Sequence, residues 1–127
     1  FAGDTAYSHH FKAIGKEFPH IDIAMMPVGP CEPRKYMYDT HVNAEEAGEA
    51  FLDLKAQQFI PMHWGTFHFG TDAFETPIRR LQRWWKRNRA TLHHKFLLIP
   101  KFGESIKIKK NHQLHQIKQI KTKQASL

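Results

Sequence analysis

The chain of 127 residues is long enough for one small domain, and its single cysteine excludes an internal disulfide. No apolar run reaches the roughly 18 residues that a membrane-spanning helix needs. The net charge of +7 comes mostly from the end of the chain, where residues 101–127 hold seven lysines against Glu104. We therefore expect a folded domain over residues 1–109 and a basic, disordered tail over residues 110–127.

The first predicted helix follows the opening segment Phe1–Thr5. Ser8 can cap a helix that runs to about Phe18, because a serine side chain accepts a hydrogen bond from the free amides of a first helical turn. The apolar side chains of this segment recur at helical spacing, so we expect them to face the core. They are Phe11, Ile14 and Phe18. His10 lies at the helix start, which by itself indicates an exposed position.

A buried strand over residues 21–27 is predicted from the apolar run Ile-Asp-Ile-Ala-Met-Met-Pro. The following segment, Pro27 to Arg34, holds three prolines and a glycine, which leave the backbone few conformations. We interpret it as a rigid loop that can shape the rim of a pocket. Cys31, inside this loop, is expected to be a packed thiol rather than a nucleophile.

The second long helix is predicted from Ala44 to about Gln57. Asn43 and Glu46 have the spacing of a capping box. The apolar face of this helix comprises Ala47, Ala50, Phe51 and Leu54. His41 precedes the helix and, from the residues alone, reads as a histidine of a surface loop.

A short buried strand over residues 59–63 comes next and delivers His63 at its carboxyl end. Trp64, Gly65 and Thr66 should then turn sharply, since glycine permits a close backbone approach.

The last predicted helix begins at Thr76-Pro77, with Thr76 as its cap and Pro77 in its first turn. Ile78, Leu81, Trp84 and Trp85 share one face, and we expect that face to be buried. The opposite face is basic, and we interpret it as solvated rather than as a nucleic-acid or membrane surface. It comprises Arg79, Arg80, Arg83, Lys86, Arg87 and Arg89. Closing strands over residues 96–100 and 106–108 are expected around a turn at 102–104. The adjacent His93 and His94 lack ligand spacing.

Asp4 and His63 are the candidate site residues of this pattern. Each follows a short apolar run and precedes a turn, as ligands do at the carboxyl ends of buried strands. A carboxylate and an imidazole presented in this way can hold a cation such as zinc. Taken alone, an aspartate in a Gly-Asp-Thr turn also fits a turn residue, and a histidine before tryptophan also fits a core position.

Five ordered blocks carry a resemblance that extends over about the first hundred residues. They are Phe1–Thr5, Tyr7–Phe11, Pro27–Arg34, His41–Glu46 and Met62–Phe67. In these blocks the chain resembles the carboxyl-terminal half of a metallo-β-lactamase-fold hydrolase, in the branch of N-acylphosphatidylethanolamine-hydrolysing phospholipase D and RomA-like proteins. The resemblance implies an α/β fold, the C-terminal half of an αββα sandwich.

The His-x-His-x-Asp-His motif of that family is absent from this sequence. The chain is therefore expected to begin in mid-fold and to require the missing N-terminal half to complete its site. Alone, it should expose a large apolar sheet face and bind metal weakly.

The resemblance implies a zinc-dependent phosphodiesterase acting on N-acylated phospholipids, with Asp4 bridging two zinc ions and His63 completing the shell of the second. His41 would contact the substrate or protonate the leaving group, and His10 would lie near the substrate. Alternatives are another hydrolase of the superfamily, such as a sugar-phosphate lactonase or a nuclease, and an inactive remnant that acts as a binding module. We expect a phospholipid or a membrane surface as partner, no nucleic acid, and a cytoplasmic or peripheral membrane location.

Overall fold

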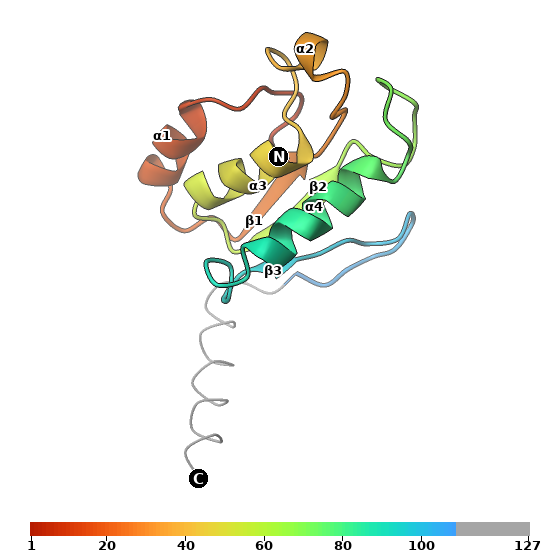
Figure 1. The fold of residues 1–127 in the computed structure, drawn as a ribbon. Helices are drawn as coiled ribbons and strands as arrows, with labels where there is room; N and C mark the ends of the chain where they lie inside the picture. Colours follow the sequence, from red (N-terminus) through yellow and green to blue (C-terminus); the bar gives the residue numbers. More distant parts are fainter. Residues whose placement is uncertain (109–127) are drawn as a thin grey trace.

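The computed structural model describes residues 1–108, so the predicted tail over residues 110–127 lies outside the described residues. The chain forms four helices and three strands in this part (Figure 1). In chain order they are α1 (His10–Glu17), β1 (Ile23–Pro27), α2 (Arg34–Met37), α3 (Ala44–Asp53), β2 (Gln58–Met62), α4 (Thr76–Arg87) and β3 (Phe96–Leu97). The predicted α/β class is confirmed.

The three strands form one parallel sheet in the order β1-β2-β3. Ile23 lies opposite Gln58 in the first pairing, and Gln58 lies opposite Phe96 in the second. Each strand is therefore joined to the next by a helical crossover, which contains α2 and α3 in the first case and α4 in the second. Because parallel strands share one direction, their carboxyl ends meet at one edge of the sheet.

The predicted closing strands are wrong in part. Only Phe96–Leu97 forms a strand, and it pairs parallel with β2 rather than with residues 106–108. The turn between them is present, since the amide of Glu104 donates to the carbonyl of Lys101 at 2.9 Å. Residues 106–108 have no strand conformation.

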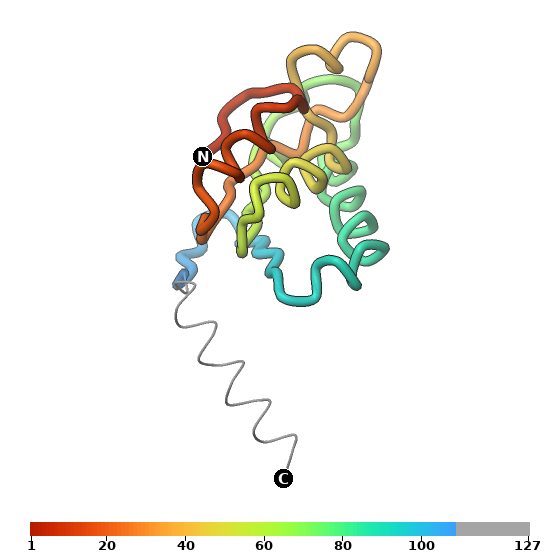
Figure 2. Tube along the Cα trace, turned by 90° about the vertical axis from the view of Figure 1, so that its left-hand side faces the viewer, coloured from red at the N-terminus to blue at the C-terminus, as the bar shows by residue number. Residues whose placement is uncertain are grey.

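Helices cover one face of the sheet. In Figure 1, α3 and α4 lie in front of β1 and β2, and the turned view of Figure 2 places both helices on the side away from the blue segment after about residue 100. Ala24, Met26 and Phe59 point toward these helices and are buried. Successive side chains of a strand point to opposite faces, so Met25 lies on the other face, where it is 37% exposed.

Helix α3 forms as the sequence predicts, although it ends at Asp53 rather than near residue 57. The Asn43 side chain accepts from the amide of Glu46 at 2.8 Å, and the Glu46 carboxylate accepts from the amide of Asn43 at 2.9 Å. This capping box is confirmed. Ala47, Ala50, Phe51 and Leu54 are all buried, so the predicted apolar face belongs to the core.

Helix α1 departs from the prediction. Its N-cap is His9, with no side-chain cap, and the Ser8 hydroxyl lies 3.1 Å from His9 Nδ1 instead of capping the helix. Only Phe11 of the predicted apolar face is buried, because Ile14 and Phe18 are 39% and 61% exposed.

A tyrosine ties the segment before α1 to α3. The Tyr7 hydroxyl donates to the Asp53 carboxylate at 2.7 Å. This hydrogen bond, with burial as a second cause, raises the pKa of Tyr7 to about 12. The amino-terminal segment is thus attached to the helix layer.

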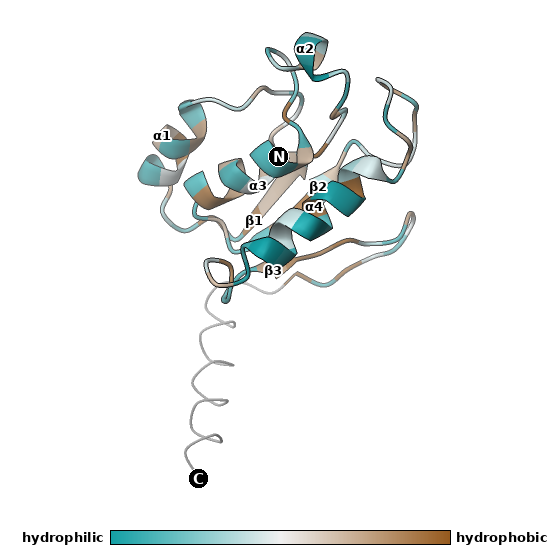
Figure 3. Ribbon diagram, in the orientation of Figure 1, coloured by the Kyte–Doolittle hydropathy of each residue, from teal (hydrophilic) through white to brown (hydrophobic). Residues whose placement is uncertain are grey.

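Helix α4 buries Ile78, Leu81 and Trp84, as predicted, whereas Trp85 of the same face is only partly buried and the cap differs. Thr76 is the first helical residue, and the N-cap Glu75 makes no side-chain cap. The ribbon of α4 is largely coloured as hydrophilic in Figure 3, in keeping with the many basic residues of this helix.

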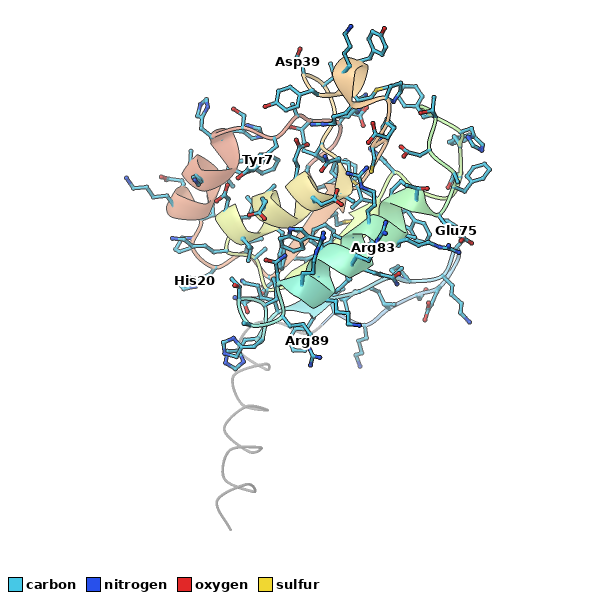
Figure 4. The ribbon with its side chains drawn as sticks, in the orientation of Figure 1. Tyr7, His20, Asp39, Glu75, Arg83 and Arg89 are labelled. Carbon is cyan, nitrogen blue, oxygen red and sulfur yellow. The ribbon has the colours of Figure 1, made fainter. Side chains whose placement is uncertain are left out.

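Part of this basic face is not simply solvated. The Arg80 side chain, 22% exposed, forms ion pairs with Glu45 of α3 at 2.8 Å and with Glu32 of the Pro27–Arg34 loop at 3.1 Å. Arg83 projects from the outer side of α4 (Figure 4). Within the described residues, no helix is both long enough and apolar enough to cross a membrane.

Candidate functional site

Asp4 and His63 lie side by side, as the sequence predicts. Asp4 Oδ1 is 3.0 Å from His63 Nδ1, although the two residues are 59 positions apart in the sequence. His63 directly follows β2. Asp4 reaches the same edge of the sheet because the segment before it runs beside β1, where the amide of Ala2 donates to the carbonyl of Met25 at 3.0 Å.

The backbone at His63 is unusual. Its φ is +60°, in the left-handed region that non-glycine residues seldom adopt and where histidine is among the more frequent exceptions. Gly65 follows with φ +72°, and a methyl group built there would lie 3.0 Å from the Phe102 ring. The sharp glycine turn expected after His63 is therefore present, and it brings Phe102 beside the pair.

Asp4 and His63 open into a cavity of about 930 Å³ that is also lined by His41. Aromatic side chains form much of the remaining wall. They are Trp64, Phe67, Phe69, Phe74 and Phe102. The arrangement combines a small polar centre with a broad apolar wall, as in sites for small molecules that carry an apolar part.

His41 also lines this cavity. Its imidazole packs edge-on against the Phe69 ring, with 5.7 Å between the ring centroids. The next residue, Val42, is fully buried, and its amide donates to the carbonyl of Thr5 at 2.8 Å. That bond places the His41 loop beside the segment that carries Asp4.

His10 lies beside this site rather than in it. His10 Nε2 is 3.4 Å from the Thr5 hydroxyl, and the imidazole packs on Phe11 with 4.1 Å between centroids. It is not among the residues that line the cavity. A substrate-contacting role for His10 stays a prediction.

Asp72 has a structural role that the sequence pattern does not indicate. Its Oδ2 accepts hydrogen bonds from the amides of Cys31 and Glu32 at 2.6 and 2.8 Å. The loop that carries Phe67, Phe69 and Phe74 is thereby fixed to the Pro27–Arg34 loop. The only sequence feature that could have pointed to this role is Gly70-Thr71-Asp72. Because this segment has the composition of an ordinary turn, it does not indicate which amides Asp72 binds.

Cys31 is packed, as the sequence predicts. Its side chain is fully buried, and the thiol donates to the carbonyl of Val28 at 3.4 Å. Burial raises the pKa of Cys31 to about 11, so the thiol is poorly suited to be a nucleophile.

As metal ligands, Asp4 and His63 have suitable donor atoms but are too few. Catalytic zinc sites usually supply three protein ligands and leave one position open. In the part of the chain that the structure describes, no group of three or more His, Cys, Asp or Glu side chains could hold one ion. The chain thus offers two neighbouring donors of such a site.

Residues 1–64, about half of the chain, match the sequence model of the family described as "Beta-lactamase superfamily domain". This match ends one residue after His63. It contains the two donors Asp4 and His63, and it also contains His10 and His41. The chain belongs to the β-lactamase superfamily. The predicted family is thereby confirmed, and the mixed α/β structure with its parallel sheet agrees with the αββα fold of that superfamily.

Named relatives support the predicted branch. N-acyl-phosphatidylethanolamine-hydrolyzing phospholipase D 1 of Caenorhabditis elegans is 39% identical over 75 residues, which are 58% of this chain and 21% of the relative. Outer membrane protein RomA of Klebsiella pneumoniae is 39% identical over 66 residues, covering 51% of this chain and 48% of RomA. Metal-dependent hydrolase YtkL of Bacillus subtilis is 38% identical over 66 residues, which are 52% of this chain and 25% of YtkL.

This β-lactamase-superfamily chain therefore spans between about a fifth and a half of the length of these relatives. The matches bear on the fold and on the family. The roles of Asp4, His10, His41 and His63 stay predictions, as does the domain boundary at residue 109.

Proposed function

We propose that this chain supplies one half of the metal centre of a zinc-dependent phosphodiesterase that acts on N-acylated phospholipids. The contact of Asp4 with His63 at 3.0 Å, in a cavity shared with His41, carries the proposal. The names of the relatives from Caenorhabditis elegans and Bacillus subtilis, a phospholipase D and a metal-dependent hydrolase, support it.

The two donors have distinct parts in the proposed centre. Asp4, whose side chain is the shorter of the two acidic types, would serve as a stiff bridging ligand for zinc, and His63 would be a ligand of the second ion. Bound zinc supplies a water of lowered pKa and stabilises negative charge on the phosphate oxygens. The left-handed backbone at His63 and the turn at Gly65 fix the imidazole at the carboxyl edge of the sheet.

His41 acts on the substrate in this proposal. Its imidazole lines the same cavity as Asp4 and His63, where it would meet a phosphate of the substrate or give a proton to a leaving oxygen. The aromatic wall around it suits the acyl part of a phospholipid.

The remaining metal ligands come from a segment that carries the His-x-His-x-Asp-His motif. Two protein ligands hold zinc weakly, because metal affinity rises with each ligand that is already in place. The exposed sheet face with Met25 and Phe96, which are 37% and 42% exposed, gives such a segment a surface to pack on.

Calorimetric titration with zinc tests the half-centre directly. We expect no submicromolar binding by the chain alone and zinc uptake once a segment with the histidine motif is joined to it. Tight stoichiometric uptake by the chain alone would contradict the proposal.

Hydrolysis by the joined protein tests the residues. With zinc and N-acylphosphatidylethanolamine, we expect Asp4→Ala and His63→Ala each to lower turnover by more than about a hundredfold, the upper end of the cost of losing only a supporting residue. Asp39→Ala and His20→Ala are matched controls, since both residues are exposed and lie at the periphery, away from the cavity lining (Figure 4). Hydrolysis of a lactone or of RNA in place of the phospholipid would identify a different hydrolase of the superfamily. Zinc uptake without turnover of any of these substrates would identify an inactive remnant that acts as a binding module.

A further inference from the structure

Arg34 joins the loop of His41 to the first turn of α3. Arg34 Nη1 donates to the backbone carbonyl of His41 at 2.8 Å, and Arg34 Nη2 donates to Glu46 Oε1 at 2.7 Å. The side chains of Arg34 and Glu46 are only 23% and 19% exposed, so this ion pair is partly shielded from water. A shielded, charge-assisted contact of this kind is stronger than an exposed one.

Glu46 is itself held in place. Its carboxylate accepts from the amide of Asn43 at 2.9 Å, and its own amide donates to Asn43 Oδ1 at 2.8 Å. The capping box therefore fixes the carboxylate that Arg34 contacts. Arg34 therefore links the carbonyl of His41, seven positions along the chain, to the rigid start of α3.

The imidazole of His41 is restrained from the other side by Phe69. The two rings meet edge to face at 5.7 Å between centroids. Phe69 is placed by the loop anchor beyond it, where the amide of Thr71 donates to the carbonyl of Glu32 at 3.0 Å. His41 thus lies between a backbone clamp and an aromatic wall.

We propose that Arg34 is a positioning residue for His41, holding its backbone so that the imidazole faces the cavity against Phe69. This inference rests on the proposed function for the use of His41 in hydrolysis. The position of the imidazole is measured in the chain without metal, separately from any hydrolysis.

The geometry requires arginine. The guanidinium presents two nitrogens in one plane, and here one nitrogen binds the His41 carbonyl while the other binds Glu46. A lysine ammonium is a single point of charge on a flexible stem, and it reproduces the charge but not the two-sided geometry. Arg34 also lies over the Tyr38 ring, 4.9 Å from its centroid, which further limits its motion.

Proton NMR of the His41 ring in the full chain without metal tests the proposal. Phe69→Leu removes the neighbouring aromatic ring and defines the His41 ring shifts in the absence of that contact. We expect Arg34→Gln to move the His41 signals toward the Phe69→Leu values and to broaden them. Arg79→Gln is the matched control, because it removes the same charge from an exposed pair with Glu75 on α4 and should leave the His41 signals unchanged.

Each outcome bears on the proposal. His41 ring signals that stay at their wild-type positions in folded Arg34→Gln would overturn it. If Arg34→Gln does not fold, the His41 ring shifts of Arg34→Lys are compared with those of the wild type and of Phe69→Leu instead. His41 signals at their wild-type positions in Arg34→Lys would equally overturn the proposal. Amide spectra of α3 and β2 show in each case whether the fold is retained.

The outcome is independent of the proposed hydrolysis. A failed zinc titration leaves the His41 ring shifts as they are, whereas failure of the Arg34 clamp leaves the contact of Asp4 with His63 intact. In a protein with a complete metal centre, Arg34→Gln should lower kcat with little change in KM, and Arg34→Lys should restore part of the loss. A rise of KM alone would instead indicate that Arg34 supports substrate binding in general.

Discussion

Cys31 shows how a single side chain can be removed from chemistry by its surroundings. The thiol is fully buried in the loop between β1 and α2, and it donates to the carbonyl of Val28 at 3.4 Å. Burial disfavours the thiolate, which is the reactive form, and raises the pKa to about 11. The loop amides on either side of this thiol are tied to Asp72, so the thiol cannot easily turn outward.

We therefore expect Cys31 to resist alkylation in the native chain. At pH 8, three units below its pKa, only about one thiol in a thousand is ionised, and access to it is blocked as well. Mass spectrometry after timed exposure to iodoacetamide measures the rate, with Ser8→Cys in a Cys31→Ser background as an exposed control. Labelling of native Cys31 at the rate seen in denaturant would show that the loop opens freely.

At the scale of elements, α3 packs tightly against α4. A methyl group built at Gly48 of α3 would lie 2.5 Å from a carbon of the Trp84 ring. Trp84 is 4% exposed and its indole nitrogen donates to Glu49 at 3.1 Å, so the ring has little freedom to move aside. Glycine at this position allows the tryptophan of one helix to lie flat on the backbone of the other.

Gly48→Ala should therefore destabilise the protein. Alanine gains up to about 1 kcal/mol in helix propensity, whereas overpacking a closed core costs about 1–3 kcal/mol, so we expect a net loss of about 1 kcal/mol. Urea unfolding followed by tryptophan fluorescence measures it. In a Trp84→Leu background the same substitution should be neutral or stabilising, and an equal loss in both backgrounds would contradict the contact.

Local signals predicted whole elements well and their junctions poorly. Asn43 and Glu46 form their capping box because both partners lie within one turn, and the face of α3 follows from periodicity alone. Ser8 and Thr76 fail as caps because the neighbouring residues, His9 and Glu75, take the N-cap position instead. Helix boundaries vary by one or two residues, so the residue type at a single position does not fix the start.

The candidate site was predictable only in part, because local sequence signals do not encode contacts between distant segments. Asp4 and His63 could be paired because each ends an apolar run and because the family resemblance brings the two together. Arg34 and Phe69 meet His41 through tertiary contacts that no local period encodes. The length of β3 could likewise not be predicted from the sequence, since it depends on pairing with a strand 38 positions earlier.

At the scale of the whole molecule, the sheet has one covered face and one open face. Helices α1, α3 and α4 lie on the covered side, and the open side presents Met25 and Phe96, 37% and 42% exposed. Ile60, partly buried, lies opposite Met25 in the sheet and shares its face. Contiguous apolar side chains of this kind favour association.

We expect the chain to self-associate through this open face. Sedimentation velocity over a range of concentrations should show a concentration-dependent shift in the wild type that Met25→Lys weakens. Phe18→Lys is the control, since Phe18 is 61% exposed on the helix side and its replacement should change little. Equal effects of the two substitutions would assign association to general surface hydrophobicity.

The edges of the sheet limit how further strands could join it. β3 comprises only two residues, and the outer margin of β1 already receives the amide of Ala2 at the carbonyl of Met25. One carbonyl of β1 is thus already bonded, and β3 offers a short margin. The broad open face is the larger surface for a second sheet, which would be held there by side-chain packing, with its orientation set by the shapes of a few methionine, isoleucine and phenylalanine side chains.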